Sequence, residues 1–161
     1  MPSSNSHHRL TPREAREQAA EATGFLAGIT ILIGDEEFEI PQRGLLDDDQ
    51  RDRMNELELE TESWDREPDI VTSLGNSRPG PLKVPYRKNN KLIKPSYSVR
   101  VAIALWGEEK YSRFKAGGGR SSDVTSTLAR LDQRIEKAAR DDSKSDSGDS
   151  TLVDSASGDR S

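Results

Sequence analysis

Few side chains in this sequence have the types and spacing that catalysis or metal binding requires. The two histidines, His7 and His8, are adjacent near the N-terminus, and the chain contains no cysteine. The folded part is therefore expected to lack the imidazole and thiolate groups of Ser-His and Cys-His nucleophiles. A histidine pair in a polar tail is a weak metal ligand set, so we interpret it as incidental and predict no metal and no cofactor.

Two further patterns resemble ligand-binding motifs but lack essential positions. Residues 47–49 (DDD) begin like a calcium loop, yet the sixth position is Asp52, where such a loop needs glycine. Residues 75–80 (GNSRPG) begin like a phosphate-binding loop but continue with proline and leucine instead of lysine and a hydroxyl residue. Nothing singles out a catalytic pair among the 29 acidic side chains. We predict that the protein is not an enzyme.

Composition bounds the class of protein. Only 31% of the residues are hydrophobic and 33% are charged, which predicts a small core with long solvated segments. The longest apolar window, residues 25–33, is far shorter than the ~20 residues that span a bilayer. The N-terminus also lacks the basic and apolar regions of a signal peptide. These features predict a soluble, intracellular protein.

The net charge of −5 conceals a strong segregation of charge along the chain. Residues 46–69 are mostly acidic among their charged positions, whereas residues 83–100 contain lysine and arginine and no acid. The two blocks either neutralise each other or offer a charged surface to a partner. One such partner is nucleic acid, because Tyr86 and Tyr97 lie among the lysine and arginine residues of 83–100. The tyrosine rings could stack on nucleobases while the basic side chains contact phosphates. The acidic net charge disfavours this alternative, a small nucleic-acid-binding accessory protein.

The elements that position these side chains are mainly helical. We predict a mainly α fold, a small helical domain with one short β-hairpin between disordered N- and C-terminal tails. Residues 11–14 (TPRE) form a capping box, and the β-branched residues 29–33 and 37–40 flank a glycine turn that is typical of a hairpin. The predicted order is a disordered tail at 1–10, a helix, hairpin and acidic helix within 11–74, a Pro/Gly-rich basic linker at 75–95, a three-helix unit at 96–140 and a disordered tail at 141–161.

Two helical faces in this order carry apolar residues. Met54, Leu57 and Trp64 share one face of the acidic helix, which is expected from about residue 48 to residue 62. In the three-helix unit, residues 124–138 repeat apolar side chains at alternating spacings of four and three, a seam of about two heptads. Such a short seam needs a surface to pack on. The seam residues, with Tyr111 and Phe114 of the preceding helix, either form an ordinary intramolecular core or contact a partner. The candidate partner-binding residues are Tyr111, Phe114, Val124, Leu128, Leu131 and Ile135.

Residues 92–97 (LIKPSY) and 104–123 (ALWGEEKYSRFKAGGGRSSD) carry a family resemblance. They resemble the tail assembly chaperones of siphophages that infect actinobacteria, in which a leucine-glycine-acid-acid-x-aromatic run precedes a glycine-rich break and a capped helix. A charged C-terminal tail follows in that family, as residues 141–161 do here. The resemblance covers roughly residues 90–140 and concerns helix ends and core positions.

The resemblance implies a non-enzymatic role in phage tail assembly. Such chaperones are thought to bind the long tape measure protein, keep it soluble and recruit tail-tube subunits in the host cytoplasm, and they are absent from the mature virion. The implied partners are therefore the tape measure protein and the major tail protein, with self-association as a further option. No membrane contact is implied.

Overall fold

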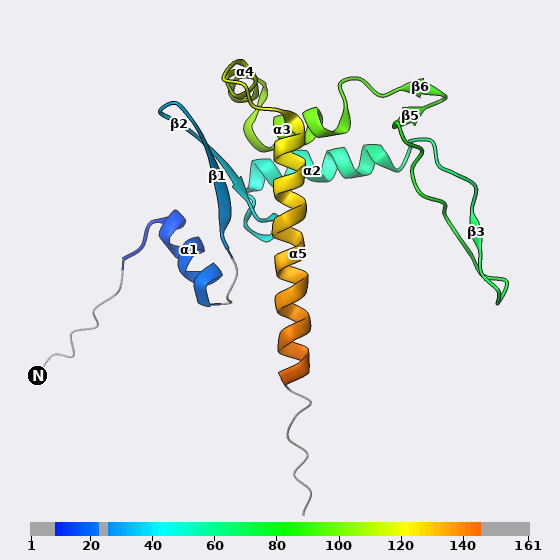
Figure 1. The fold of residues 1–161 in the computed structure, drawn as a ribbon, viewed down its shortest axis with the longest axis horizontal. Helices are drawn as coiled ribbons and strands as arrows, with labels where there is room; N and C mark the ends of the chain where they lie inside the picture. Colours follow the sequence, from blue (N-terminus) through cyan, green and yellow to red (C-terminus); the bar gives the residue numbers. More distant parts are fainter. Residues whose placement is uncertain (1–8, 23–25, 146–161) are drawn as a thin grey trace, which may run out of the picture.

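The computed structural model describes residues 9–22 and 26–145, and it confirms a mainly α domain (Figure 1). Of the predicted disordered tails at 1–10 and 141–161, residues 1–8 and 146–161 lie outside the described residues, while α5 continues five residues beyond the predicted end at 140. In chain order the elements are α1 (Pro12–Ala22), β1 (Gly28–Ile33), β2 (Glu36–Pro41), a 3-10 turn (Arg43–Leu45), α2 (Asp48–Thr61), β3 (Ile70–Val71), β4 (Ser77–Arg78), β5 (Arg87–Lys88), β6 (Lys91–Leu92), α3 (Tyr97–Trp106), α4 (Glu108–Ala116) and α5 (Ser121–Ser145).

Helix α3 lies at the centre and packs against α2, α4 and α5 (Figure 1). It is the most apolar helix, with Val101, Ala102, Ala104 and Leu105 all buried. Side chains from β2, α2, α4 and α5 complete the same core. The first half of the chain and the three C-terminal helices therefore share one hydrophobic core rather than folding separately.

The predicted β-hairpin is present and supplies aromatic packing to this core. Gly34 has a φ of +60° in the two-residue turn between β1 and β2, a conformation that favours glycine. Phe38 on β2 is fully buried and meets the rings of Trp106 and Phe114 edge-on, with centroids 5.3 and 5.1 Å away. The indole Nε1 of Trp106 donates to the Glu39 carbonyl at 2.7 Å, which ties the end of α3 to β2.

Helix α2 begins with a reciprocal cap and turns its apolar face to α3. The Gln50 amide donates to Asp47 Oδ1 at 2.7 Å, and the Asp47 amide donates back to Gln50 Oε1 at 3.1 Å. Met54 and Leu57 are buried in the main core, as their spacing predicts. Trp64 is also buried but does not share their face, because α2 ends at Thr61 and the chain has turned away before it.

The segment between α2 and α3 contains two further hairpins, so the described residues hold three two-stranded sheets rather than one. Strands β3 and β4 pair antiparallel, and β5 pairs with β6 across a turn in which Asn89 and Asn90 both have positive φ. The Asp65 carboxylate accepts the backbone N–H groups of both asparagines, at 3.0 and 2.7 Å. Much of the residue range expected to be a linker, 75–95, is thus hydrogen-bonded into hairpins.

Candidate partner-binding surface

The structure places four of the six predicted partner-binding residues inside the protein. Phe114 on α4 and Val124, Leu128 and Leu131 on α5 are at most 3% exposed and belong to the main core. Tyr111 and Ile135 are half-buried. The seam is therefore closed by the chain's own helices from Val124 to Leu131, which agrees with the intramolecular alternative for these residues. A surface that is open to a partner has to be found elsewhere.

An apolar groove lies beside the β5–β6 hairpin, and we call it the tyrosine groove. It encloses about 410 Å³ between residues 84–86, the end of β6 and the start of α3. Val84 and Leu92 on its rim are 84% and 54% exposed, values that are high for apolar side chains in a folded protein. The rest of the lining is mostly apolar with three polar residues: Pro85, Tyr86, Ile93, Lys94, Ser96, Tyr97 and Ser98.

Three aromatic rings support this groove. Trp64 packs against Tyr86 and Tyr97 with centroid distances of 5.4 and 6.1 Å, and the two tyrosines lie 5.6 Å apart. Tyr97 also packs against the main core, whereas Trp64 is not part of that core cluster, so the three rings extend the core toward the groove. The indole Nε1 of Trp64 is buried and has no hydrogen-bond partner among the described residues. Trp64 therefore supports both tyrosine rings, while Val84 and Leu92 on the rim of the groove are exposed to solvent.

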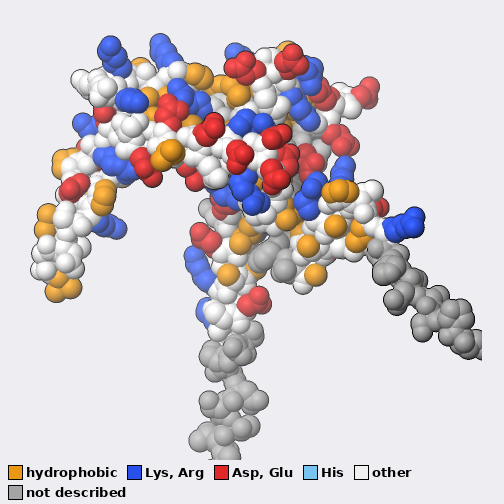
Figure 2. Space-filling view, turned by 180° about the vertical axis from the view of Figure 1, so that it is seen from behind, with side chains coloured by type: hydrophobic (Ala, Val, Ile, Leu, Met, Phe, Trp, Pro, Cys, Tyr) orange, Lys and Arg blue, Asp and Glu red, His pale blue; other side chains and the backbone are white. Residues whose placement is uncertain are grey.

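A narrow arm formed by residues 66–82 projects from the same end of the molecule (Figures 1 and 2). Its base is closed by the amide of Glu67 donating to the Pro81 carbonyl at 2.8 Å and by the Arg66 guanidinium donating to the Gly80 carbonyl at 3.1 Å. Val71 and Leu74 near its tip are 69% and 86% exposed. Figure 2 shows hydrophobic side chains at the end of the arm, with lysine and arginine gathered over the adjacent end of the body.

The acidic and basic blocks neutralise each other only in part. Arg100 Nη1 on α3 donates to both carboxylate oxygens of Glu60 on α2, at 2.7 and 2.9 Å, and this charge-assisted pair joins the two blocks. Within the described part of the chain, the other five bases of residues 83–100 form no ion pair. The basic end of the molecule therefore presents cations to solvent beside the tyrosine groove.

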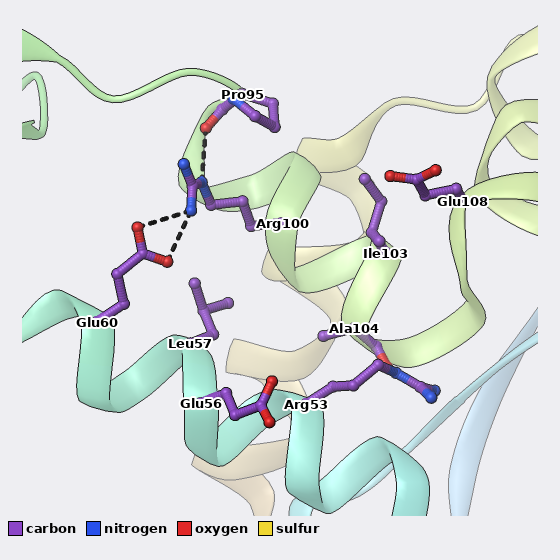
Figure 3. Close-up of a pocket in the computed structure, with 9 residues that line it drawn as sticks. All are labelled: Arg53, Glu56, Leu57, Glu60, Pro95, Arg100, Ile103, Ala104 and Glu108. Atoms are coloured by element: carbon purple, nitrogen blue, oxygen red, sulfur yellow. Dashed lines mark hydrogen bonds and ion pairs between the residues drawn. The ribbon is translucent and has the colours of Figure 1, made fainter.

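A second groove, of about 350 Å³, runs between α2 and α3 (Figure 3). The Glu60–Arg100 pair closes one end, and Arg53 Nε donates to the Ala104 carbonyl at 2.7 Å at the other. Leu57 and Ile103 supply apolar walls between them. Both arginines already hold the two helices together, so we assign this groove a structural role.

Comparisons with known proteins were made for the whole chain. Neither a scan against protein-family models nor searches of curated proteins and solved structures found a match. Among the described residues, no three His, Cys, Asp or Glu side chains are grouped as a metal site requires. None of the described helices is both long and apolar enough to cross a membrane.

Sequence reasoning missed the arm and the groove because their apolar residues are isolated between prolines, glycines and charges. Val71, Leu74, Val84 and Leu92 show neither the 3.6-residue nor the two-residue period that marks a buried face. This lack of periodicity was itself a signal. Apolar residues that belong to no periodic face are expected to stay exposed, because no helix or strand face carries them into the core. Val84 and Leu92 are exposed at the groove, and Val71 and Leu74 are exposed near the tip of the arm.

Proposed function

We propose that this protein is a tail assembly chaperone of a siphophage that infects actinobacteria. In this proposal it binds the tape measure protein in the host cytoplasm, helps recruit tail-tube subunits and is absent from the mature virion. Two observations support it: the resemblance of residues 92–97 and 104–123, and the apolar side chains left uncovered around the tyrosine groove and the arm tip. The second observation carries the proposal, because an apolar groove with exposed aliphatic side chains on its rim is a typical feature of partner-binding surfaces.

The shape of this surface suits a long helical client. An amphipathic helix can lay its apolar face in a groove, with aliphatic side chains as anchors. The tyrosine groove offers a firm aromatic base for such anchors, and the arm offers a second apolar contact at a distance from it. The surrounding lysines would pair with acids on the polar face of the client.

The test is a pull-down of tape measure protein co-expressed with the full chain. Val84→Asp combined with Leu92→Asp places two charges on the rim of the groove, and both side chains are exposed, so the fold should be kept. We expect this variant to lose most of the captured client. Leu59→Asp is the matched control, because Leu59 on α2 is 67% exposed and lies outside the groove. Equal capture by both variants would remove the groove from the proposal.

One observation favours nucleic acid as a second candidate. Five basic residues of 83–100 form no ion pair with any described residue and are available to contact phosphates: Lys83, Arg87, Lys88, Lys91 and Lys94. Against it, both tyrosines of this segment already pack on Trp64, which limits base stacking. A gel-shift series separates the candidates: a nucleic-acid binder shifts DNA with an affinity that falls steeply as salt rises, and a chaperone of an apolar client shows no such shift.

A further inference from the structure

The outer edge of β1 is an open strand edge. Strand β1 has the sequence GITILI, and among the described residues it pairs on one side only, with β2. Proteins usually protect such an edge with lysine, proline, a bulge or a covering element. β1 has neither a charged residue nor a proline, and it pairs with β2 in unbroken register over all six positions. An edge that is rich in β-branched residues and carries no charge, proline or bulge is a template for another strand.

The register identifies which backbone groups face outward. The Gln42 amide donates to the Ala27 carbonyl at 2.9 Å, so this pair is of the hydrogen-bonded type, and pairs of this type alternate along the ladder. Thr30 and Leu32 therefore direct their N–H and C=O groups away from β2. No hydrogen bond within the described part of the chain uses either residue. Each offers one donor and one acceptor to a further strand.

The side chains of β1 are also incompletely covered. Phe38 and Ile40 on β2 face the core and are fully buried, whereas Ile29, Ile31 and Ile33 on the same face of β1 are only half-buried. On the opposite face, Leu32 is 68% exposed. The core thus ends in a row of three isoleucines along the open edge, where one more strand would cover them.

We propose that the strand which covers this edge is β1 of a second copy, giving a four-stranded antiparallel sheet across a two-fold axis. Pairing Ile31 with its own counterpart places Ile29 opposite Ile33 of the other copy, so all three isoleucines meet isoleucines. The same register sets Thr30 opposite Leu32, and their outward N–H and C=O groups then bond in both directions. The strand is self-complementary in this register.

Charge favours the same pairing. Strand β2 carries Glu36, Glu37 and Glu39, whereas β1 is uncharged. Joining two copies through β1 keeps the two acidic strands at the outer edges of the new sheet, separated by both β1 strands. Pairing through β2 would bring these carboxylates together. The chain's own charge pattern therefore selects β1 as the joining edge.

The test measures the mass of the full chain by sedimentation equilibrium over a wide range of concentration. We expect a reversible dimer, with the Thr30 and Leu32 amides protected from hydrogen exchange only where the dimer is populated. Thr30→Pro removes an outward N–H and leaves the β2 ladder intact, and we expect it to raise the dimer dissociation constant about tenfold or more.

Leu32→Lys is a second variant that does not depend on proline being tolerated, because it places a charge on the edge in the way natural edges are protected. Leu59→Lys is its control, with the leucine 67% exposed on α2 against 68% for Leu32. We expect only the β1 variants to weaken the dimer. A monomer at all concentrations, or a dimer that both β1 variants leave unchanged, would overturn the proposal. Neither result depends on binding of the tape measure protein.

Discussion

Individual glycines after α4 differ in what they contact, although in the sequence they form one run, residues 117–119. A Cβ at Gly117 would collide with the side chain of Ile33 on β1, whereas Gly118 has a φ of +95° and open space around it. A Cβ at Gly119 would lie 2.5 Å from the ring of Phe114. The sequence predicted a helix break here, but it does not show that Ile33 of a distant strand and the ring of Phe114, five residues back in α4, exclude side chains at Gly117 and Gly119.

Gly119→Ala should destabilise the protein through this contact with Phe114. The ring is fully buried against Phe38 and Trp106, so it cannot move aside without opening the core. We expect the free energy of unfolding to fall by about 1–3 kcal/mol, the usual cost of overpacking a close-packed site. Urea denaturation of the two proteins measures this difference.

Gly44→Ala is the control for this substitution. The atom nearest to a Cβ at Gly44 is Gln42 Oε1, 3.7 Å away, and no core side chain lies within 4 Å. We expect a change within about 0.5 kcal/mol of zero, as for most surface substitutions. Equal losses in the two variants would show that the Phe114 contact does not determine the effect, because reduced entropy of the unfolded chain stabilises a Gly→Ala variant and gives no loss.

Helix caps show which elements the sequence specifies locally. The capping box predicted at residues 11–14 is present: the Thr11 amide and hydroxyl donate to the Glu14 carboxylate at 2.8 and 2.9 Å, and they lower its pKa. The reciprocal cap of Asp47 and Gln50 has the same spacing, although it was not among the predicted elements. Caps are predictable from sequence because both partners lie within one turn.

Asp47→Ala and Thr11→Ala should have different consequences, although each removes one capping side chain. Helix α2 contributes Met54 and Leu57 to the core, and Gln50 Nε2 also donates to the Leu105 carbonyl at 2.9 Å. Helix α1 has a single buried residue, Ala20, which is not part of that core. We expect Asp47→Ala to lower the free energy of global unfolding by about 1 kcal/mol.

For Thr11→Ala we expect faster amide exchange within α1 and an unchanged global unfolding midpoint, because an element docked through one small side chain opens on its own. Hydrogen exchange followed by NMR distinguishes local from global opening. A matching fall in global stability for both variants would mean that α1 is integrated into the core.

The three hairpins differ in how well the sequence predicts them. Strands β1 and β2 have six residues each and a visible alternation, and they were predicted. Strands β3 to β6 have two residues each, too few for any period to appear. Their pairing depends on local contacts such as the Asp65 carboxylate at the Asn89–Asn90 turn. Because these contacts join residues about 25 positions apart, spacing along the chain does not predict them.

The whole molecule is organised around one core that ends part-way along α5. The apolar repeat from Val124 to Ile135 was visible in the sequence, but its burial was not, since an intramolecular core and a partner interface require the same spacing. In the structure, Val124, Leu128 and Leu131 are buried by α3 and β2, whereas Ile135 lies one turn beyond and is half-buried. The remainder of α5 projects from the body (Figure 1).

Leucine and isoleucine truncations along α5 should locate this end of the core. Leu131 is 2% exposed, so Leu131→Ala removes a packed side chain and should lower the free energy of unfolding by about 2–4 kcal/mol. Ile135→Ala removes a half-buried side chain and should cost about 1 kcal/mol or less, because less apolar area leaves contact. Urea titrations at low protein concentration give both values, since self-association adds stability only when the dimer is populated. If Ile135→Ala costs as much as Leu131→Ala under these conditions, the core continues along α5 and the projecting half of that helix is packed in solution.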